Sequence, residues 1–189
     1  SFSDHDSHET WRLTLAGVLA KSSNTGTIQA AELIGPDKLY EYLKRFGVGQ
    51  VTGLGFPGEG SGYVPPVKDW SGSSFPTIAF GQGLSMSALQ AASVYQTLGN
   101  GGQRITPQLV DSYIDNDGHV THPKAPDSSQ VVTPETAKQV VEMMEEVVRK
   151  NGTAPMAAIP GYRIAGKTGT ANRIDDSCGC YKGYTASFI

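Results

Sequence analysis

The chain contains 189 residues and carries a formal net charge of −3, and this length is sufficient for one domain with a hydrophobic core. The charges form no basic block of the kind that phosphate backbones require, which argues against a nucleic-acid partner. The longest strongly apolar stretch, residues 13–20, is far shorter than the roughly 20 residues that a membrane-spanning helix needs.

The first predicted helix is capped by Thr14 and runs directly into the sequence KSSNTG, residues 21–26. Its apolar residues are expected to face a core: Leu15, Val18 and Leu19. The SSN triplet therefore lies at a helix end.

A second helix is predicted to begin at Gly35 and Pro36 and to close at Gly47. Its apolar face consists of Leu39, Tyr40, Leu43 and Phe46. From Gly47 to Phe80 glycine and proline are dense and helical periodicity disappears. We expect this segment to form turns and short extended pieces that frame a cleft.

Two further helices follow in chain order. One is capped near Ser85 and ends at Gly99, with Leu89, Ala92 and Leu98 expected to point inward. The other opens at Thr133, Pro134 and Glu135. Its apolar residues recur at helical spacing: Val140, Val141, Met144 and Val148.

Two extended runs close the chain, YRIAGKTGTA at residues 162–171 and YTASFI at residues 184–189. They can pair as antiparallel strands, and the order of helices first and strands last indicates an α+β domain. Two strands seldom hold a domain together, so we expect the remaining strands to lie outside this chain. Both ends look like cuts within a longer polypeptide, which makes residues 1–189 an incomplete domain.

Cysteine and histidine content points to no metal site. Cys178 and Cys180 are too few for a zinc site of their own, and two interpretations stay open: free thiols, or a local disulfide formed in an oxidising compartment. Of the two, we predict the local disulfide. His5 and His8 lie among acidic residues, but a solvated terminal segment explains them better than a metal site.

The sequence AGKTGTAN combines Lys167, Thr168, Gly169 and Thr170 on one predicted strand. A cation beside two hydroxyls suits an anionic ligand that lies along a strand edge, and the glycine leaves room for a ligand backbone. A surface strand with a solvated lysine would explain this tripeptide equally well. Similarly, Ser22 and Asn24 can aim a hydroxyl and an amide into one cleft, or simply form a turn.

The two motifs occur together with further landmarks in a fixed order, and together these resemble the transpeptidase domain of a class B, division-type penicillin-binding protein. The landmarks are LAKSSNTGT, FGVGQVTGLGFPGE, AFGQGLSMSALQ, NGG, VVTPETA, AGKTGTAN and YTASFI. The CGC loop is similar to that of actinobacterial members. The resemblance implies a partial penicillin-binding-protein/serine β-lactamase-like transpeptidase fold, in which the KTG strand is the edge of an antiparallel sheet.

The resemblance also implies roles for the motif residues. Ser22 would relay a proton with Lys167 beside it, and Asn24 would hold the substrate amide. Thr168 and Thr170 would bind the terminal carboxylate of the substrate beside Gly169. The backbone N–H of Thr170 would supply half of an oxyanion hole.

The chain departs from the family pattern at one point, because no serine is followed by a lysine three places later. The nucleophile motif SxxK is therefore not in this chain, and we expect it in a preceding segment. Three alternatives stay open: a serine β-lactamase, a D,D-carboxypeptidase of the same fold, or a non-catalytic domain that binds β-lactams or peptidoglycan.

Substrate, partners and location are likewise implied by the resemblance. The substrate would be a peptidoglycan stem peptide ending in D-Ala-D-Ala, and β-lactams would acylate the enzyme. Other division or cell-wall proteins would be partners, with no nucleic acid, no metal and no cofactor. The protein would lie on the extracytoplasmic face of the cell membrane, anchored by an N-terminal segment that is not in this chain.

Overall fold

The computed structural model describes residues 2–175 and 177–189. The helices are α1 (Leu15–Lys21), α2 (Asn24–Glu32), α3 (Gly35–Arg45), α4 (Ser74–Ala79), α5 (Ala88–Gly99) and α6 (Pro134–Val148), with short 3-10 turns η1 (Val67–Asp69) and η2 (Pro155–Ala157). Within the described residues the strands form three antiparallel pairs: β1 (Gln103–Ile105) with β4 (Ser128–Gln130), β2 (Tyr113–Ile114) with β3 (Val120–Thr121), and β5 (Thr168–Asp175) with β6 (Cys180–Phe188). The predicted α+β class is confirmed.

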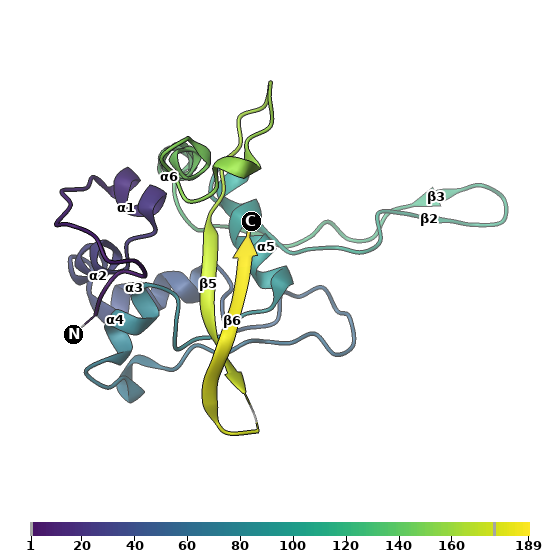
Figure 1. Ribbon diagram of the computed structural model, residues 1–189. Helices are drawn as coiled ribbons and strands as arrows, with labels where there is room; N and C mark the ends of the chain where they lie inside the picture. The colour runs from purple at the N-terminus through teal and green to yellow at the C-terminus, as the bar shows by residue number, and fades with distance from the viewer. Residues whose placement is uncertain (1, 176) are drawn as a thin grey trace.

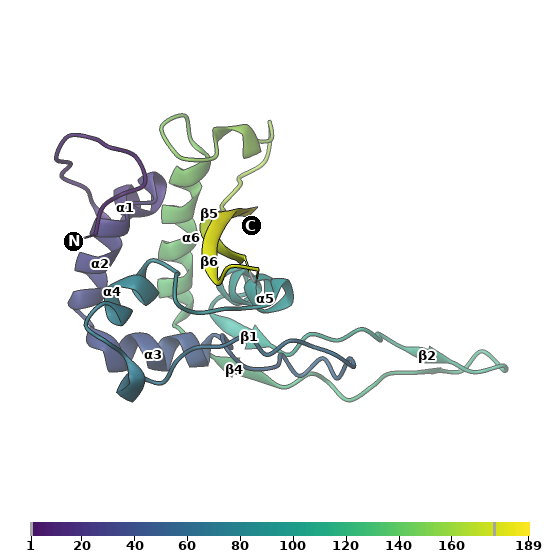
Figure 2. The ribbon, with the colours of Figure 1, turned by 60° about the horizontal axis from the view of Figure 1, so that its bottom comes forward.

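Helix α6 is the centre of the helical part and contacts both α1 and α5 (Figures 1 and 2). Thr133 caps it and Pro134 opens it, as predicted, because proline fits the first helical turn, where no N–H is needed. Its inner face is fully apolar: Ala137, Met144, Val147 and Val148. Helix α2 contacts α1, α3 and α4, and none of the helices in the described residues is long and apolar enough to cross a lipid bilayer.

Strands β5 and β6 pair in the register Thr168↔Phe188 and run beside α5 and α6 (Figure 2). The predicted antiparallel pairing of the two last runs is confirmed. Every residue of β6 is exposed, including the aromatic residues Tyr181, Tyr184 and Phe188. A strand that has one unpaired edge and exposed aromatic side chains promotes aggregation unless another part of the protein covers it.

Two helices and four strands were not expected from the sequence. Helix α2 contains Gly26 and two threonines, which are poor helix formers, and it owes its stability to the Ser23 cap and to burial of Ile28 and Ala31. Helix α4 contradicts the expectation of turns and extended pieces throughout residues 47–80. The expectation of only two strands was also wrong, because β1–β4 are two or three residues long and too short to show a pattern.

The predicted inner faces of two helices need correction. In α5 the buried residues are Gln90, Ser93 and Thr97, whereas Ala92 is exposed and Leu89 and Leu98 are only half-buried. The Gln90 amide is buried because it donates to the carbonyl oxygens of Gln50 and Ser61, which satisfies its polar atoms. In α1, Leu15 is 59% exposed, and Ala20 is the buried residue.

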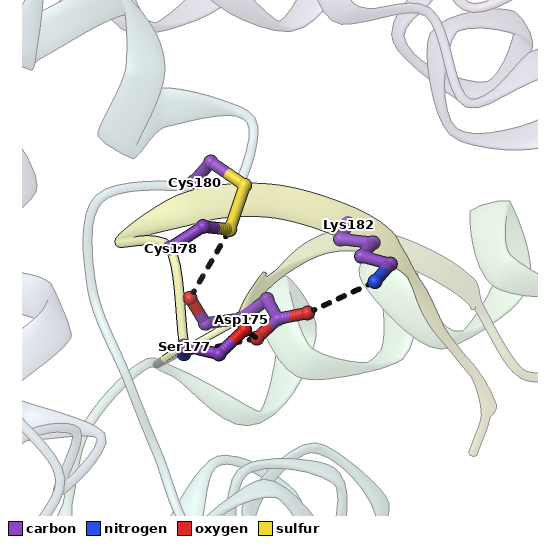
Figure 3. Close-up of a disulfide and its surroundings, with 5 residues drawn as sticks. All are labelled: Asp175, Ser177, Cys178, Cys180 and Lys182. Atoms are coloured by element: carbon purple, nitrogen blue, oxygen red, sulfur yellow. Dashed lines mark hydrogen bonds and ion pairs between the residues drawn. A yellow bond between two sulfur atoms is a disulfide. The ribbon is translucent and has the colours of Figure 1, made fainter.

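The turn between β5 and β6 is closed by a disulfide between Cys178 and Cys180, whose Cα atoms lie 5.2 Å apart (Figure 3). Asp175 organises the same turn. Its carboxylate accepts hydrogen bonds from the Ser177 backbone N–H at 3.0 Å and from the Ser177 hydroxyl at 2.5 Å, and it pairs with Lys182 at 3.4 Å. Of the two interpretations open for the cysteines, the structure supports the disulfide.

Mass spectrometry of the protein provides a direct test of this bond. Alkylation without reductant should leave Cys178 and Cys180 unmodified, and alkylation after reduction should modify both. Protein refolded in reductant is the matched control. Complete alkylation of both thiols in protein isolated under oxidising conditions would contradict the bond.

Candidate functional site

The SSN triplet lies at the junction of α1 and α2, with each residue in a different conformation. Ser22 ends α1 in the left-handed region, with φ 54° and ψ 41°, and is the one non-glycine residue with positive φ among those described. Ser23 is extended and caps α2, where its hydroxyl accepts from the Gly26 N–H at 3.0 Å. Asn24 is the first residue of α2. Such backbone strain persists only where the surroundings fix it, and it is concentrated at functional sites.

Close contact between α1 and α2 fixes this junction. A Cβ at Gly26 would lie 2.7 Å from the Val18 side chain of α1, so a larger residue there would force the Val18 side chain to shift. Lys21 adds a longer link, because its amine donates to the Asn151 carbonyl in the loop after α6 at 2.9 Å. The position of Ser22 is thereby tied to three helices.

The KTG segment extends the pairing of β5 with β6 by one residue. Lys167 and Ile189 exchange both backbone hydrogen bonds, at 2.8 and 3.3 Å. Because bonded pairs alternate along antiparallel strands, Gly169 is the next residue bonded to β6, whereas Thr168 and Thr170 direct their N–H and C=O groups to the opposite edge. No strand of the described residues covers that edge. The backbone of Thr170 is thus available to a ligand.

Lys167 connects the two motifs. Its amine lies 2.6 Å from the Ser22 hydroxyl, 2.9 Å from the Thr168 carbonyl oxygen and 3.4 Å from the Thr168 hydroxyl. The expected proximity of Ser22 and Lys167, 145 residues apart in the sequence, is confirmed. Lys167 is half-buried and not fully exposed on a strand edge as the sequence suggested.

Burial lowers the pKa of Lys167 below its ordinary value. The ion pairs formed by the described residues do not include Lys167, so no carboxylate offsets this effect there. A lysine amine with a lowered pKa, hydrogen-bonded to a hydroxyl, can exchange a proton through that hydroxyl. It can also present positive charge to an anionic ligand.

The other predicted site residues are placed as follows. The Asn24 amide donates to the Ser3 carbonyl at 3.2 Å and is not bonded to the Ser22, Lys167 and Thr168 group. Thr170 is exposed next to that group on β5. A Cβ at Gly169 would lie 2.5 Å from the Ser187 hydroxyl of β6, so the Ser187 side chain would have to rotate to admit a larger residue.

Two residues near the site were not found from the sequence. The Thr153 hydroxyl lies 2.8 Å from the Thr168 hydroxyl and shares a hydrogen bond with it. The Asp4 carboxylate contacts Ser23, Thr25 and His8, so this part of the terminal segment is packed at Asp4, whereas His8 is exposed, as expected. Only the long-range contacts reveal either residue, since neither belongs to a local motif.

The sequence is similar to known protein families and to individual characterised proteins. Residues 1–189 match the family described as the penicillin binding protein transpeptidase domain. Penicillin-binding protein PbpB of Mycolicibacterium smegmatis is 48% identical over 180 residues, which cover 92% of this chain and 28% of that protein. Peptidoglycan D,D-transpeptidase FtsI of Escherichia coli is 42% identical over 163 residues, covering 86% of this chain and 26% of that protein.

Solved structures agree with these matches. Penicillin-binding protein 3 from Mycobacterium tuberculosis, complexed with aztreonam, superimposes with a TM-score of 0.93 at 42% identity, covering 98% of this chain and 43% of that chain. The transpeptidase domain of penicillin-binding protein 3 from Burkholderia pseudomallei gives a TM-score of 0.80 at 34% identity, covering 93% of this chain and 51% of that chain. The chain thus spans less than a third of the length of the curated relatives described above.

The predicted resemblance to division-type penicillin-binding proteins is confirmed by sequence and by fold. The Ser22–Lys167 contact lies within the part of the chain that these relatives share. The chain belongs to the penicillin-binding protein transpeptidase domain family.

Proposed function

We propose that this chain is part of a D,D-transpeptidase that cross-links peptidoglycan stem peptides by serine acyl transfer and is acylated by β-lactams. The observation that carries the proposal is the 2.6 Å contact between the Lys167 amine and the Ser22 hydroxyl, beside the uncovered edge of β5. Related proteins support it: the relative in Escherichia coli is named a peptidoglycan D,D-transpeptidase, and those of Mycobacterium tuberculosis bind aztreonam and ampicillin.

In this proposal a serine hydroxyl from outside residues 1–189 attacks the carbonyl carbon between the two terminal D-alanines. A C–O bond forms, the C–N bond breaks, and the leaving D-alanine amine takes up a proton. The acceptor amine of a second stem peptide then attacks the ester, which restores the serine hydroxyl. Ser22 and Lys167 would pass the proton to the leaving nitrogen and take it back from the acceptor.

The remaining groups would bind the substrate. The Thr170 N–H, directed away from β6, would donate to the oxyanion, and hydroxyls of Thr168 and Thr170 would hold the terminal carboxylate. Removal of one oxyanion donor costs about 10²- to 10³-fold in rate where it has been tested. Asn24 would hold the peptide amide after release from its present bond to Ser3.

Location and partners belong to the same proposal. A disulfide between Cys178 and Cys180 supports an oxidising, extracytoplasmic environment, because cytosolic thiols are kept reduced. Division or cell-wall proteins would then be the partners, and peptidoglycan the substrate. Residues 1–189 would form one part of the transpeptidase domain.

Fluorescent penicillin and the full-length natural chain provide the test. The expected result is a stable, near-stoichiometric covalent adduct, together with cross-linked product from stem peptides. Rapid hydrolysis and release of the label would instead indicate a β-lactamase, and release of D-alanine without cross-linking would indicate a carboxypeptidase. The absence of any adduct would leave only a non-catalytic binding domain.

A further inference from the structure

The N-terminal segment holds the start of α2 through the carboxylate of Asp4. One oxygen, Oδ1, accepts from the Thr25 N–H at 2.8 Å and from the Thr25 hydroxyl at 3.2 Å. The other, Oδ2, accepts from the Ser23 hydroxyl at 2.8 Å and faces His8 Nε2 at 2.9 Å. The Asp4 side chain is only 8% exposed. A carboxylate has about four acceptor positions, and here all of them are used.

These bonds hold both neighbours of Asn24. The Ser23 hydroxyl donates to Asp4 and at the same time accepts from the Gly26 N–H, so Asp4 fixes the direction of the α2 cap. Asn24 itself is bonded to the carbonyl of Ser3, the residue before Asp4. The negative charge of Asp4 lies at the N-terminus of α2, where it interacts favourably with the helix dipole. Three consecutive residues of α2 and its cap thus depend on Ser3 and Asp4.

Asp4 is also connected, through His8 and Trp11, to Lys21, the residue that precedes Ser22. His8 covers the outer side of Asp4, and its ring stacks on Trp11 with 3.6 Å between centroids. The Lys21 amine lies 5.7 Å from the centroid of the same Trp11 ring. Both flanks of the strained Ser22 residue are therefore connected to Asp4, one through Ser23 and the other through the aromatic stack.

The charge state of Asp4 agrees with this arrangement. Burial acts to raise the pKa of the Asp4 carboxyl, but hydrogen bonds from Thr25, His8 and Ser23 outweigh it and leave that pKa below its ordinary value. Asp4 is accordingly ionised at neutral pH and accepts from Thr25 and Ser23. Because His8 Nδ1 faces the Glu9 carbonyl at 2.6 Å, His8 Nε2 donates to Asp4 when the imidazole is protonated.

We propose that Asp4 is a positioning residue for the SSN motif: its four contacts keep the Ser22 hydroxyl and the Asn24 amide in register with Lys167, so that its loss slows acyl transfer. This inference rests on the proposed function. Asp4 acts through Ser23 and Thr25 and touches neither the substrate nor the reacting atoms. Displacement of a catalytic group by about 1 Å can cost on the order of 10² in rate, which is the size of effect at stake.

The substitution Asp4→Asn tests the proposal in the full-length natural chain. Asparagine has the same shape, but its NH₂ group would face either the Thr25 N–H or the Ser23 hydroxyl that already caps α2. The matched control is Asp6→Asn, which removes the same charge from an exposed carboxylate two residues further on. Both variants alter net charge equally, so only the contacts of Asp4 distinguish them.

Acylation by a fluorescent penicillin should be measured as two constants, the dissociation constant of the initial complex and the limiting rate constant of acylation. Asp4→Asn should lower the limiting rate constant roughly 10- to 100-fold, whereas Asp6→Asn should stay within about twofold of the unsubstituted chain. A purely structural role would lower the melting temperature and the fraction of active protein, and would leave the rate constant of the folded fraction unchanged. Equal rate constants for the two variants would overturn the proposal.

Two milder variants cover the case in which Asp4→Asn fails to fold. His8→Gln and Thr25→Val each weaken one part of the Asp4 cluster, and each should lower the limiting rate constant several-fold, to a lesser extent than Asp4→Asn. Unchanged rate constants in both would overturn the proposal, because Asp4 would then serve folding alone. If the unsubstituted chain forms no adduct, the proposed function fails and this inference fails with it. If that chain is acylated normally and the Asp4 and Asp6 variants have equal limiting rate constants, only the proposed role of Asp4 is excluded.

Discussion

A polypeptide of these 189 residues alone should form no covalent adduct with fluorescent penicillin, although it contains SSN and KTGT intact. No serine in the chain has a lysine three places later, and Ser22, the serine next to Lys167, sits in the proposed proton path. Removal of the nucleophile from a serine enzyme costs on the order of 10⁶ in kcat even where the other groups remain. Gel fluorescence and intact mass are the measurements.

A longer chain that includes the preceding segment is the matched control for this experiment. It should become labelled under the same conditions, and peptide mapping should place the adduct outside residues 1–189. An adduct on Ser22, Ser23 or any other serine of this chain would contradict the prediction. Circular dichroism must accompany the assay, because the exposed aromatic residues of β6 favour aggregation of the isolated piece.

Lys167→Ala in the full-length chain should lower the acylation rate by roughly 10²- to 10⁴-fold, the range that positioned proton-transfer groups contribute. The variant removes the amine that contacts Ser22 and Thr168, while the backbone pairing with Ile189 remains.

Thr168→Val should also slow acylation, since it removes the hydroxyl that Thr153 contacts. The second-order rate constant of penicillin binding checks both variants.

Lys167→Ala should change the free energy of unfolding far less than it changes the acylation rate. Because burial lowers the pKa of Lys167, the folded protein binds fewer protons than the unfolded chain between that pKa and the ordinary one. The free energy of unfolding therefore rises as pH increases through this interval, and the buried charge is unfavourable at neutral pH. Loss of the charge offsets part of the packing lost with the lysine stem. Lys150→Ala, an exposed lysine after α6, is the control, and a wild-type rate for Lys167→Ala would exclude the lysine from the mechanism.

Sequence periodicity predicted those elements whose signals are local. Helices α3 and α6 have an apolar stripe and a clear start, and both lie where they were expected. Helix α2 has a weak pattern, in which Gly26 lies against Val18, and it depends on the Ser23 cap and on tertiary packing. The buried side of α5 was missed because Gln90 and Thr97 are polar residues that become satisfied only through long-range or backbone hydrogen bonds.

In the candidate site, too, the sequence predicted what local motifs indicate and missed what long-range contacts create. The resemblance of the KTG and SSN motifs indicated that Ser22 and Lys167 meet, and they do. Asp4 and Thr153 belong to no recognisable spacing, and their contacts with Ser23 and Thr168 depend on the path of the whole chain. Gly169 was assigned to substrate access, and a Cβ there would also meet the Ser187 hydroxyl on β6, a contact that the sequence does not indicate. Motifs thus identify groups that act chemically, and the groups that hold them emerge only from the fold.

Because the backbone of Ser22 is left-handed, the residue that would be most stable at position 22 differs from the residue that the proposed chemistry needs. At φ 54° a glycine would be free of the strain that serine bears, and glycine is also the residue that most often ends a helix in this conformation. Selection of variants by melting temperature alone would therefore favour Ser22→Gly, a change that deletes the hydroxyl contacted by Lys167. Stabilised forms of this protein for crystallography or inhibitor screening should keep serine at position 22 and be stabilised by substitutions at other positions.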